Sequence, residues 1–149
     1  MAMSEKEFND YVDNLQEKIF TEAKNAYGPK GFDRWRNPKF HGRLENPDGT
    51  ARVTGGCGDT IEMTLRIKDG HIVDGAFVTT GCASSGLCGS FAVELAIGKK
   101  VESVFELEGQ DVLEALGTFP EDDAHCAFLA IETLHEAVNE YMVQSVAKQ

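Results

Sequence analysis

Three cysteines of this chain lie in short stretches of which two contain glycine and two carry a carboxylate or an imidazole. Cys57 belongs to GGCGDT, with Asp59 two residues later, and Cys82 belongs to TTGCASSG. Cys126 belongs to EDDAHCAF and directly follows His125. Thiolates bind soft metals and attack sulfur, and carboxylates and imidazoles are common additional ligands. These five side chains are therefore candidates for metal binding or sulfur chemistry.

All three cysteines are predicted to lie where a loop meets a helix or a strand. Cys57 precedes a predicted strand, and Cys82 and Cys126 open predicted helices, where the helix dipole favours a thiolate. No CxxC pair is present, so the usual spacing of zinc ribbons and fingers is absent. Any one of these cysteines also fits the packing of a small buried residue. Their shared context favours a common site.

The N-terminal residues predict a helix over about 5–25. Ser4 and Glu7 form a capping box at its start. Apolar residues then recur at helical spacing at Phe8, Val12, Leu15, Ile19 and Ala23. Gly28-Pro29 is expected to end the helix, and an irregular segment with Pro38 and Gly42 as breakers is expected to follow.

The middle of the chain predicts a small antiparallel sheet. The residues that alternate with polar ones in the long strand are Ile61, Met63, Leu65 and Ile67. Asp69-Gly70 predicts a hairpin turn, and 71–78 the return strand. The register of this strand stays open, because a two-residue loop turns Ala76 and Val78 inward whereas Phe77 is the better core residue. A shorter strand near 43–53, interrupted by Asn46-Pro47-Asp48-Gly49, is predicted to complete a sheet of three.

The chain after Gly81 is predicted to be helical. One helix is expected up to Gly98, two short ones over 101–107 and 110–116, and a last one from Asp122 or Asp123 to about Val146. The buried face of this last helix is predicted to carry Ile131, Leu134, Val138 and Tyr141. These elements predict an α+β fold, with a three-stranded antiparallel sheet packed against several helices. We expect a single domain over 1–149, with a core over about 37–147.

The composition excludes several classes of protein. The 149 residues include 25 acidic and 14 basic side chains, which give a net charge of −11. Such a chain is not expected to bind nucleic acid or an anionic membrane. No apolar run reaches the ~20 residues of a membrane span, and the polar N-terminus does not resemble a signal peptide. We therefore expect a cytoplasmic protein whose four cysteines are reduced.

The motifs GCGD, GCASS and FPEDDAHC, in this order, resemble those of the iron–sulfur cluster scaffold family that comprises IscU and the N-terminal domain of NifU. The resemblance extends from about Asn37 to Tyr141 and includes the spacings of 25 and 44 residues between the three cysteines. The related SufU type has a longer insertion before its last cysteine and lacks the histidine that His125 supplies here. The chain therefore resembles the IscU/NifU type more closely.

The resemblance implies a non-enzymatic scaffold that carries a transient [2Fe–2S] cluster. Cys57, Cys82 and Cys126 would be its thiolate ligands, and Asp59 or His125 would complete the coordination. The implied partners are a cysteine desulfurase, iron and electron donors, and acceptor apo-proteins. The protein would be a monomer or a cluster-linked dimer. The same side chains make a plausible zinc site, so Zn²⁺ is expected in purified protein.

The chain departs from the family in three places. Residues 119–123 read FPEDD, where members served by a dedicated Hsp70-type chaperone carry leucine-proline-proline-valine-lysine. A groove for that apolar peptide should reject paired carboxylates, so we do not expect this chain to use the chaperone in that way. Residues 37–40 read NPKF instead of NPxN. Cys88 is additional, and it lies about 240° round the helix from Cys82, which favours core packing over a ligand role.

Two other functions are compatible with the same thiols. One is a zinc-dependent sulfurtransferase partner of a cysteine desulfurase, as in SufU-like proteins, in which zinc closes the site until a ligand is displaced. The other is a zinc hydrolase, which three thiolates disfavour because they donate much charge to the metal. The remaining histidines, which are His41, His71 and His135, are expected at the surface or at an edge.

Overall fold

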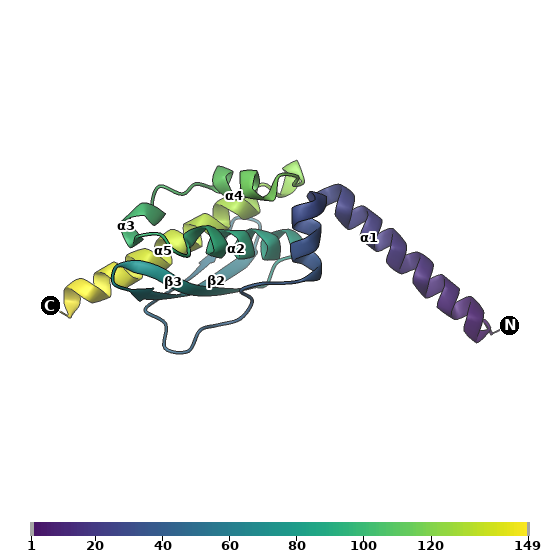
Figure 1. Ribbon diagram of the computed structural model, residues 1–149, viewed down its shortest axis with the longest axis horizontal. Helices are drawn as coiled ribbons and strands as arrows, with labels where there is room; N and C mark the ends of the chain where they lie inside the picture. The colour runs from purple at the N-terminus through teal and green to yellow at the C-terminus, as the bar shows by residue number, and fades with distance from the viewer. Residues whose placement is uncertain (1, 149) are drawn as a thin grey trace.

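The computed structural model describes residues 2–148 and has an α+β architecture (Figure 1). Its elements, in chain order, are α1 (Glu5–Arg36), β1 (Gly49–Thr54), β2 (Thr60–Lys68), β3 (His71–Thr79), α2 (Ala83–Ala96), α3 (Val101–Val104), α4 (Gly109–Leu116), the 3₁₀ turn η1 (Glu121–Asp123) and α5 (His125–Ala147). The strands form one antiparallel sheet in the order β1-β2-β3. The predicted fold class and the three-stranded sheet are confirmed.

A β-bulge settles the register of the return strand. Asp69 and Gly70 form the hairpin turn with φ of 53° and 74°, the left-handed values that a two-residue turn of this kind requires. The pairing shifts between Arg66 and Ile67, and Phe77 then lies opposite Met63, so that both side chains are buried. Phe77 is therefore the core residue, as its size suggested.

The first strand is shorter than predicted. It begins at Gly49, and the preceding residues form turns in which Asn46 has a positive φ of 49°. The Asp48 carboxylate accepts a hydrogen bond from the Ile67 amide at 2.8 Å, which holds this turn against the edge of β2. The predicted interruption is present over 46–48, but residues 43–45 before it are not a strand, because the Asn-Pro turn directs them away from the ladder.

The core lies between the sheet and the two long helices α2 and α5. Figure 1 shows both helices lying against the sheet, with α5 packed on β1 and β2 and α2 packed on β3. Leu65 of β2 and Leu134 and Val138 of α5 are fully buried. Each such side chain contributes about 1.5–3 kcal/mol when it leaves water. The predicted buried face of α5 is confirmed, although Tyr141 is only half-buried.

Helix α1 continues past the predicted end at Asn25 and runs to Arg36 with a bend at Gly28. Gly28 has φ 70° and ψ −177°, which an L side chain rarely adopts, and a Cβ there would lie 2.8 Å from Thr118 Cβ. Pro29 then starts a second helical segment, since the first turn of a helix does not need its N–H. Gly28-Pro29 is therefore a bend, and residues 29–36 are helical where an irregular segment was predicted.

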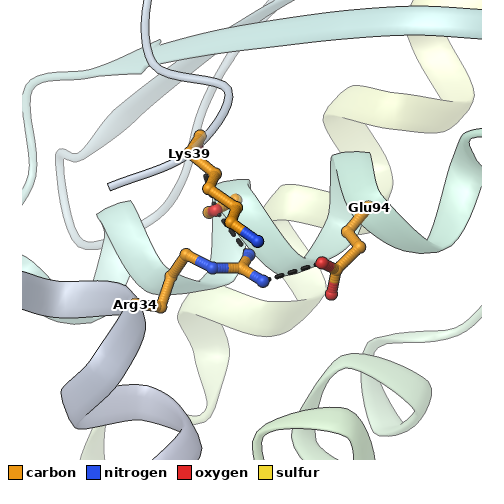
Figure 2. A network of polar contacts seen from close by, with 4 residues as sticks. Arg34, Lys39 and Glu94 are labelled. Carbon is orange, nitrogen blue, oxygen red and sulfur yellow. Dashed lines mark hydrogen bonds and ion pairs between the residues drawn. The ribbon is translucent and has the colours of Figure 1, made fainter. Parts of the chain in front are cut away.

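The second segment of α1 is fixed to α2 by the buried guanidinium of Arg34. Figure 2 shows Arg34 reaching Glu94, with a 2.7 Å contact between Nη2 and Oε1. Its other terminal nitrogen donates to Ser90 Oγ at 2.8 Å, and that hydroxyl donates to the Lys39 carbonyl at 3.0 Å. The guanidinium also lies 4.3 Å from the Phe91 ring centre. These contacts hold the segment that leads into the sheet.

The first segment of α1, residues 5–27, projects away from the rest of the molecule, and we call it the arm (Figure 1). The predicted helix and its Ser4 cap are present, with the Ser4 hydroxyl accepting from the Glu7 amide at 3.1 Å. Ala23 is buried, whereas the larger residues of the apolar stripe are exposed. No helix within residues 2–148 has both the length and the apolar character that a membrane crossing needs.

Candidate metal and sulfur site at the ends of three elements

The connection between β1 and β2 carries Cys57 and Asp59. The Gly55 amide donates to the Asp59 carbonyl at 2.9 Å, and the Gly58 amide donates to the Gly55 carbonyl at 3.0 Å. Cys57 lies at the tip of this turn and is exposed. The prediction that Cys57 precedes the long strand is confirmed, since β2 begins at Thr60. A thiol in this position is accessible to an incoming reactant or partner.

Cys82 lies at the N-cap of α2, as predicted, and its side chain is also exposed. The preceding residue, Gly81, lets the Asp59 carboxylate approach this helix end. A Cβ on Gly81 would lie 2.7 Å from Asp59 Oδ2 and would collide with the Ser85 hydroxyl. The β1–β2 turn can therefore lie this close to α2 only because residue 81 has no side chain.

Ser85, in the first turn of α2, links Asp59 to Cys126. The serine is completely buried, and its hydroxyl donates to Asp59 Oδ2 at 3.0 Å. The same oxygen lies 3.4 Å from Cys126 Sγ. One hydroxyl thus joins a carboxylate from the β1–β2 turn to a thiol from α5. Two of the five predicted site residues are brought together in this way.

The first turn of α5 supplies His125 and Cys126, as predicted. Cys126 is 1% exposed, whereas the His125 side chain faces solvent with Nε2 3.7 Å from Cys126 Sγ. A surface cavity of about 300 Å³ is lined by Cys57 and His125, together with Phe128 and Glu132. The imidazole therefore shares this cavity with the exposed thiol and also lies close to the buried one.

Burial raises the pKa of the Cys126 thiol above its ordinary value. The Ser85 hydrogen bond lowers this pKa in part, and the nearby negative groups of Cys82, Asp123 and Asp59 raise it further. The metal-free chain therefore does not favour the thiolate that the helix position predicted at Cys126, and desolvation is the largest cause. A bound cation would reverse this balance, since coordination deprotonates a thiol.

The five side chains share one region but do not form a finished ligand shell. Within residues 2–148, no three His, Cys, Asp or Glu side chains are close enough to hold a metal ion as they stand. Coordination by three or more of them therefore requires movement, and the glycine-rich turn that carries Cys57 is the part least tied by hydrogen bonds to side chains. Cys88 is fully buried in the core, which confirms its predicted packing role.

Four polar residues around the site were not identified from the sequence as part of it. Besides Ser85, these are Ser84, Tyr27 and Asp123. The completely buried Ser84 hydroxyl donates to Asp123 Oδ2 at 2.8 Å and lies 3.0 Å from Tyr27 Oη. Burial raises the Tyr27 pKa, the hydrogen bond with Ser84 lowers it in part, and the nearby groups of Cys82, Asp123 and Cys126 raise it further. The serines are visible in GCASSG, but nothing in the sequence shows which carboxylates they meet.

Comparison with known proteins places the chain in one family. Residues 26–148 match the family described as NifU-like N terminal domain. The chain is 37% identical over 116 residues to "Iron-sulfur cluster assembly scaffold protein IscU 1" of Archaeoglobus fulgidus, and the match covers 77% of this chain and 76% of that protein. It is 30% identical over 128 residues to "Iron-sulfur cluster assembly scaffold protein IscU" of Escherichia coli K12, and the match covers 83% and 99% of the two chains.

A solved structure has the same fold. The N-terminal part of a nitrogen-fixing NifU-like protein from Brucella abortus aligns with a TM-score of 0.63 at 18% identity, over 81% of this chain and 97% of that one. At that identity the match concerns the fold alone. The family match over most of the chain and the two sequence relatives agree with it, and the chain belongs to the family of NifU-like N-terminal domains.

Proposed function

We propose that this chain is a scaffold on which a [2Fe–2S] cluster is assembled and from which the cluster is passed to acceptor apo-proteins. Two relatives at 30% and 37% identity are named iron–sulfur cluster assembly scaffold proteins, which supports this class of function. The structural observation that carries the proposal is the Ser85 hydroxyl, which contacts both Asp59 and Cys126. A carboxylate and a buried thiol from distant parts of the chain are thereby held beside two exposed thiols.

In this proposal the cluster is cargo, and the thiolates of Cys57, Cys82 and Cys126 hold it. Cysteine thiolates are the usual ligands of iron–sulfur clusters. Asp59 or His125 supplies the fourth ligand, and either is harder than a thiolate and holds iron less tightly. A cluster with one such ligand is easier to release than one with four cysteines. That property suits a protein that must give its cluster away.

Sulfur would arrive as a persulfide on a cysteine desulfurase. A thiolate of the scaffold attacks the outer sulfur, the S–S bond of the persulfide breaks, and the desulfurase cysteine leaves as a thiolate. Cys57 and Cys82 are exposed and are better placed for this attack than the buried Cys126. Reduction of the transferred sulfur to sulfide then needs electrons from a separate donor protein. The chain acts as a scaffold and not as a catalyst.

Residues 119–123, which precede His125, support the proposal that this chain does not use the Hsp70-type chaperone as other family members do. Glu121 and Asp122 are exposed in the turn η1, where chaperone-served family members carry apolar residues. An apolar peptide groove would have to desolvate both carboxylates. We therefore propose that release of the cluster does not depend on Hsp70 recognition of this segment. The scaffold unit itself would comprise the body after Gly28, with the arm as an addition.

The decisive experiment is anaerobic reconstitution with ferrous iron, L-cysteine and a cysteine desulfurase, followed by visible circular dichroism. A cluster spectrum should form on the protein and move to an added apo-ferredoxin. Cys57→Ser should abolish it, whereas Cys88→Ser, which alters only a buried core thiol, should keep it. Spectra of Asp59→Ala and His125→Ala would identify the fourth ligand. If zinc stays bound, no cluster forms and desulfurase turnover rises, the scaffold proposal fails and a zinc-dependent sulfurtransferase partner replaces it.

A further inference from the structure

The arm lies almost entirely outside the part of the chain that matches the family, which begins at residue 26. It presents large apolar side chains to solvent, and these are Phe8 (55% exposed), Tyr11 (57%), Val12 (41%), Leu15 (45%) and Ile19 (45%). Figure 1 shows the arm extending from the body, with no other described element along its outer part. A contiguous apolar stripe on an exposed helix typically marks an interaction surface.

The spacing of the stripe is that of a helix that packs on another helix. Phe8, Val12, Leu15 and Ile19 follow one another at intervals of four, three and four residues, which are the d, a, d and a positions of a heptad repeat. The two a positions carry β-branched Val12 and Ile19, and Leu15 occupies a d position. β-branched residues at a with leucine at d favour two-stranded parallel coiled coils. The residue types therefore indicate a partner helix of the same kind.

The charges of the arm leave the stretch of the seam from Phe8 to Ile19 free of carboxylates. At 100° per residue, the acidic side chains of Asp10, Asp13 and Glu17 lie between 140° and 200° from Phe8, on the opposite face of the helix. From Phe8 to Ile19 the positions that flank the seam carry Asn9, Tyr11, Gln16 and Lys18, none of which is acidic. Glu5 and Glu22 occupy the next a and d positions, so they end the apolar seam on both sides, and two parallel copies bring like carboxylates together there. This repulsion limits the pairing to the stretch from Phe8 to Ile19 and weakens it.

The base of the arm is held by aromatic contacts, so its direction is defined. Phe20 packs edge-on against Phe32 and Trp35 of the second segment, with ring centres 5.9 Å and 6.0 Å away. Arg36 lies 4.7 Å from the Phe20 ring centre. The stripe faces away from these contacts, since Phe20 is about 100° or more round the helix from Phe8 and Ile19. A second chain can therefore reach the stripe without displacing the arm.

We propose that the arm pairs with the arm of a second copy of this chain in a short two-stranded coiled coil, along the stripe from Phe8 to Ile19. Burial of two such stripes removes on the order of 1,000 Å² of surface from water, which is at the low end for specific interfaces. The dimer is therefore weak and depends on protein concentration. It needs neither metal nor cluster, so it differs from a dimer linked by a shared cluster.

The test is sedimentation velocity on the metal-free, reduced protein from about 5 to about 500 µM, a range that spans weak association. The mass should rise from 16.3 kDa towards twice that value as concentration increases. Leu15→Asp places a charge in the seam and should raise the dissociation constant at least about tenfold. Asn14→Asp adds the same charge at an exposed position outside the seam and should leave it unchanged. Added salt should strengthen the dimer, because it screens the repulsion between acidic bodies.

Two results would overturn the proposal. One is a monomer at every concentration, which would leave the stripe for a different partner, such as a protein with an apolar groove. The other is a dimer that survives both Leu15→Asp and a second seam variant, Ile19→Asp. Far-UV circular dichroism and the melting temperature of each variant check that the helix and the body remain folded. Because no iron or sulfide is present, failure here says nothing against the scaffold function, and failure of cluster assembly says nothing against the dimer.

Discussion

The arm and helix α5 carry similar apolar patterns but have opposite surroundings. In α5 the residues at helical spacing pack across β1 and β2, and Leu134 and Val138 are fully buried. In the arm the equivalent spacing produces a stripe that remains in solvent, because the bend at Gly28 directs this segment away from the sheet. Apolar periodicity therefore predicts that a helix forms and which of its faces is apolar. It does not predict what covers that face.

The largest expected effect is the difference between the two helices in how much a leucine-to-alanine substitution lowers the free energy of unfolding. Leu134→Ala should lower the free energy of unfolding by about 2–5 kcal/mol, because it leaves a cavity in the core. Leu15→Ala in the arm should cost less than about 1 kcal/mol, since its side chain is already 45% exposed. Urea denaturation of the metal-free protein at low concentration measures both. Equal losses of the free energy of unfolding would show that the apolar stripe of the arm is packed in the core and not exposed.

An intermediate effect is expected at the junction between the two regions. Gly28→Ala forces a side chain into the left-handed region at φ 70° and against Thr118, and should cost roughly 1–3 kcal/mol. Gly86→Ala is the matched control, because a Cβ on Gly86 meets nothing within 4 Å. The control should not destabilise the protein. If Gly28→Ala were equally harmless, the bend would not be fixed by the glycine.

A smaller effect is expected from the buried thiol at the start of α5. The pKa of Cys126 is raised in the folded chain, so the folded state holds this proton more tightly than the unfolded state does. Its contribution to stability is complete below the pKa of an unfolded thiol, and is lost as the pH rises from there through the folded pKa. The free energy of unfolding of the metal-free protein should accordingly fall with alkaline pH.

The matched variant for this pH dependence is Cys126→Ser, which does not titrate in that range. Urea titrations from neutral to alkaline pH should show a shallower decline for the variant than for the parent chain. An identical decline in both proteins would mean that other groups cause it. The arm contributes nothing to this difference, since it contains no cysteine.

Much of the body could be predicted from its sequence because its patterns are local. The alternation along β2, the Asp69-Gly70 turn and the stripe of α5 each report a regular element and its buried side. The errors come from tertiary context. Gly28-Pro29 is compatible with a stop or with a bend, and only the contact with Thr118 distinguishes them. The bulge in β3 likewise satisfies the burial of Phe77, which no two-residue turn predicts by itself.

For the candidate site, too, local features could be predicted from the sequence and tertiary contacts could not. The five proposed residues were found because cysteine, aspartate and histidine have distinctive chemistry, and the structure places them at the ends of neighbouring elements. Ser84 and Ser85 were missed because serine is common at helix starts, and their partners lie 39 and 26 residues away. The protonation of Cys126 was also mispredicted, since the helix position is visible in the sequence whereas the depth of burial is not.

The two consecutive serines fasten two carboxylates of the site to one turn of α2. Ser84 and Ser85 are neighbours on one helical turn, so the backbone of α2 sets the distance between the carboxylates of Asp123 and Asp59 that they bind. Asp59 belongs to the turn that carries Cys57, so the Ser85 bond also fastens one end of this turn to α2. Residues 55–58 make no hydrogen bond to a side chain in the described part of the chain, so the Cys57 thiol can shift by a rotation of this short stretch about its fastened end.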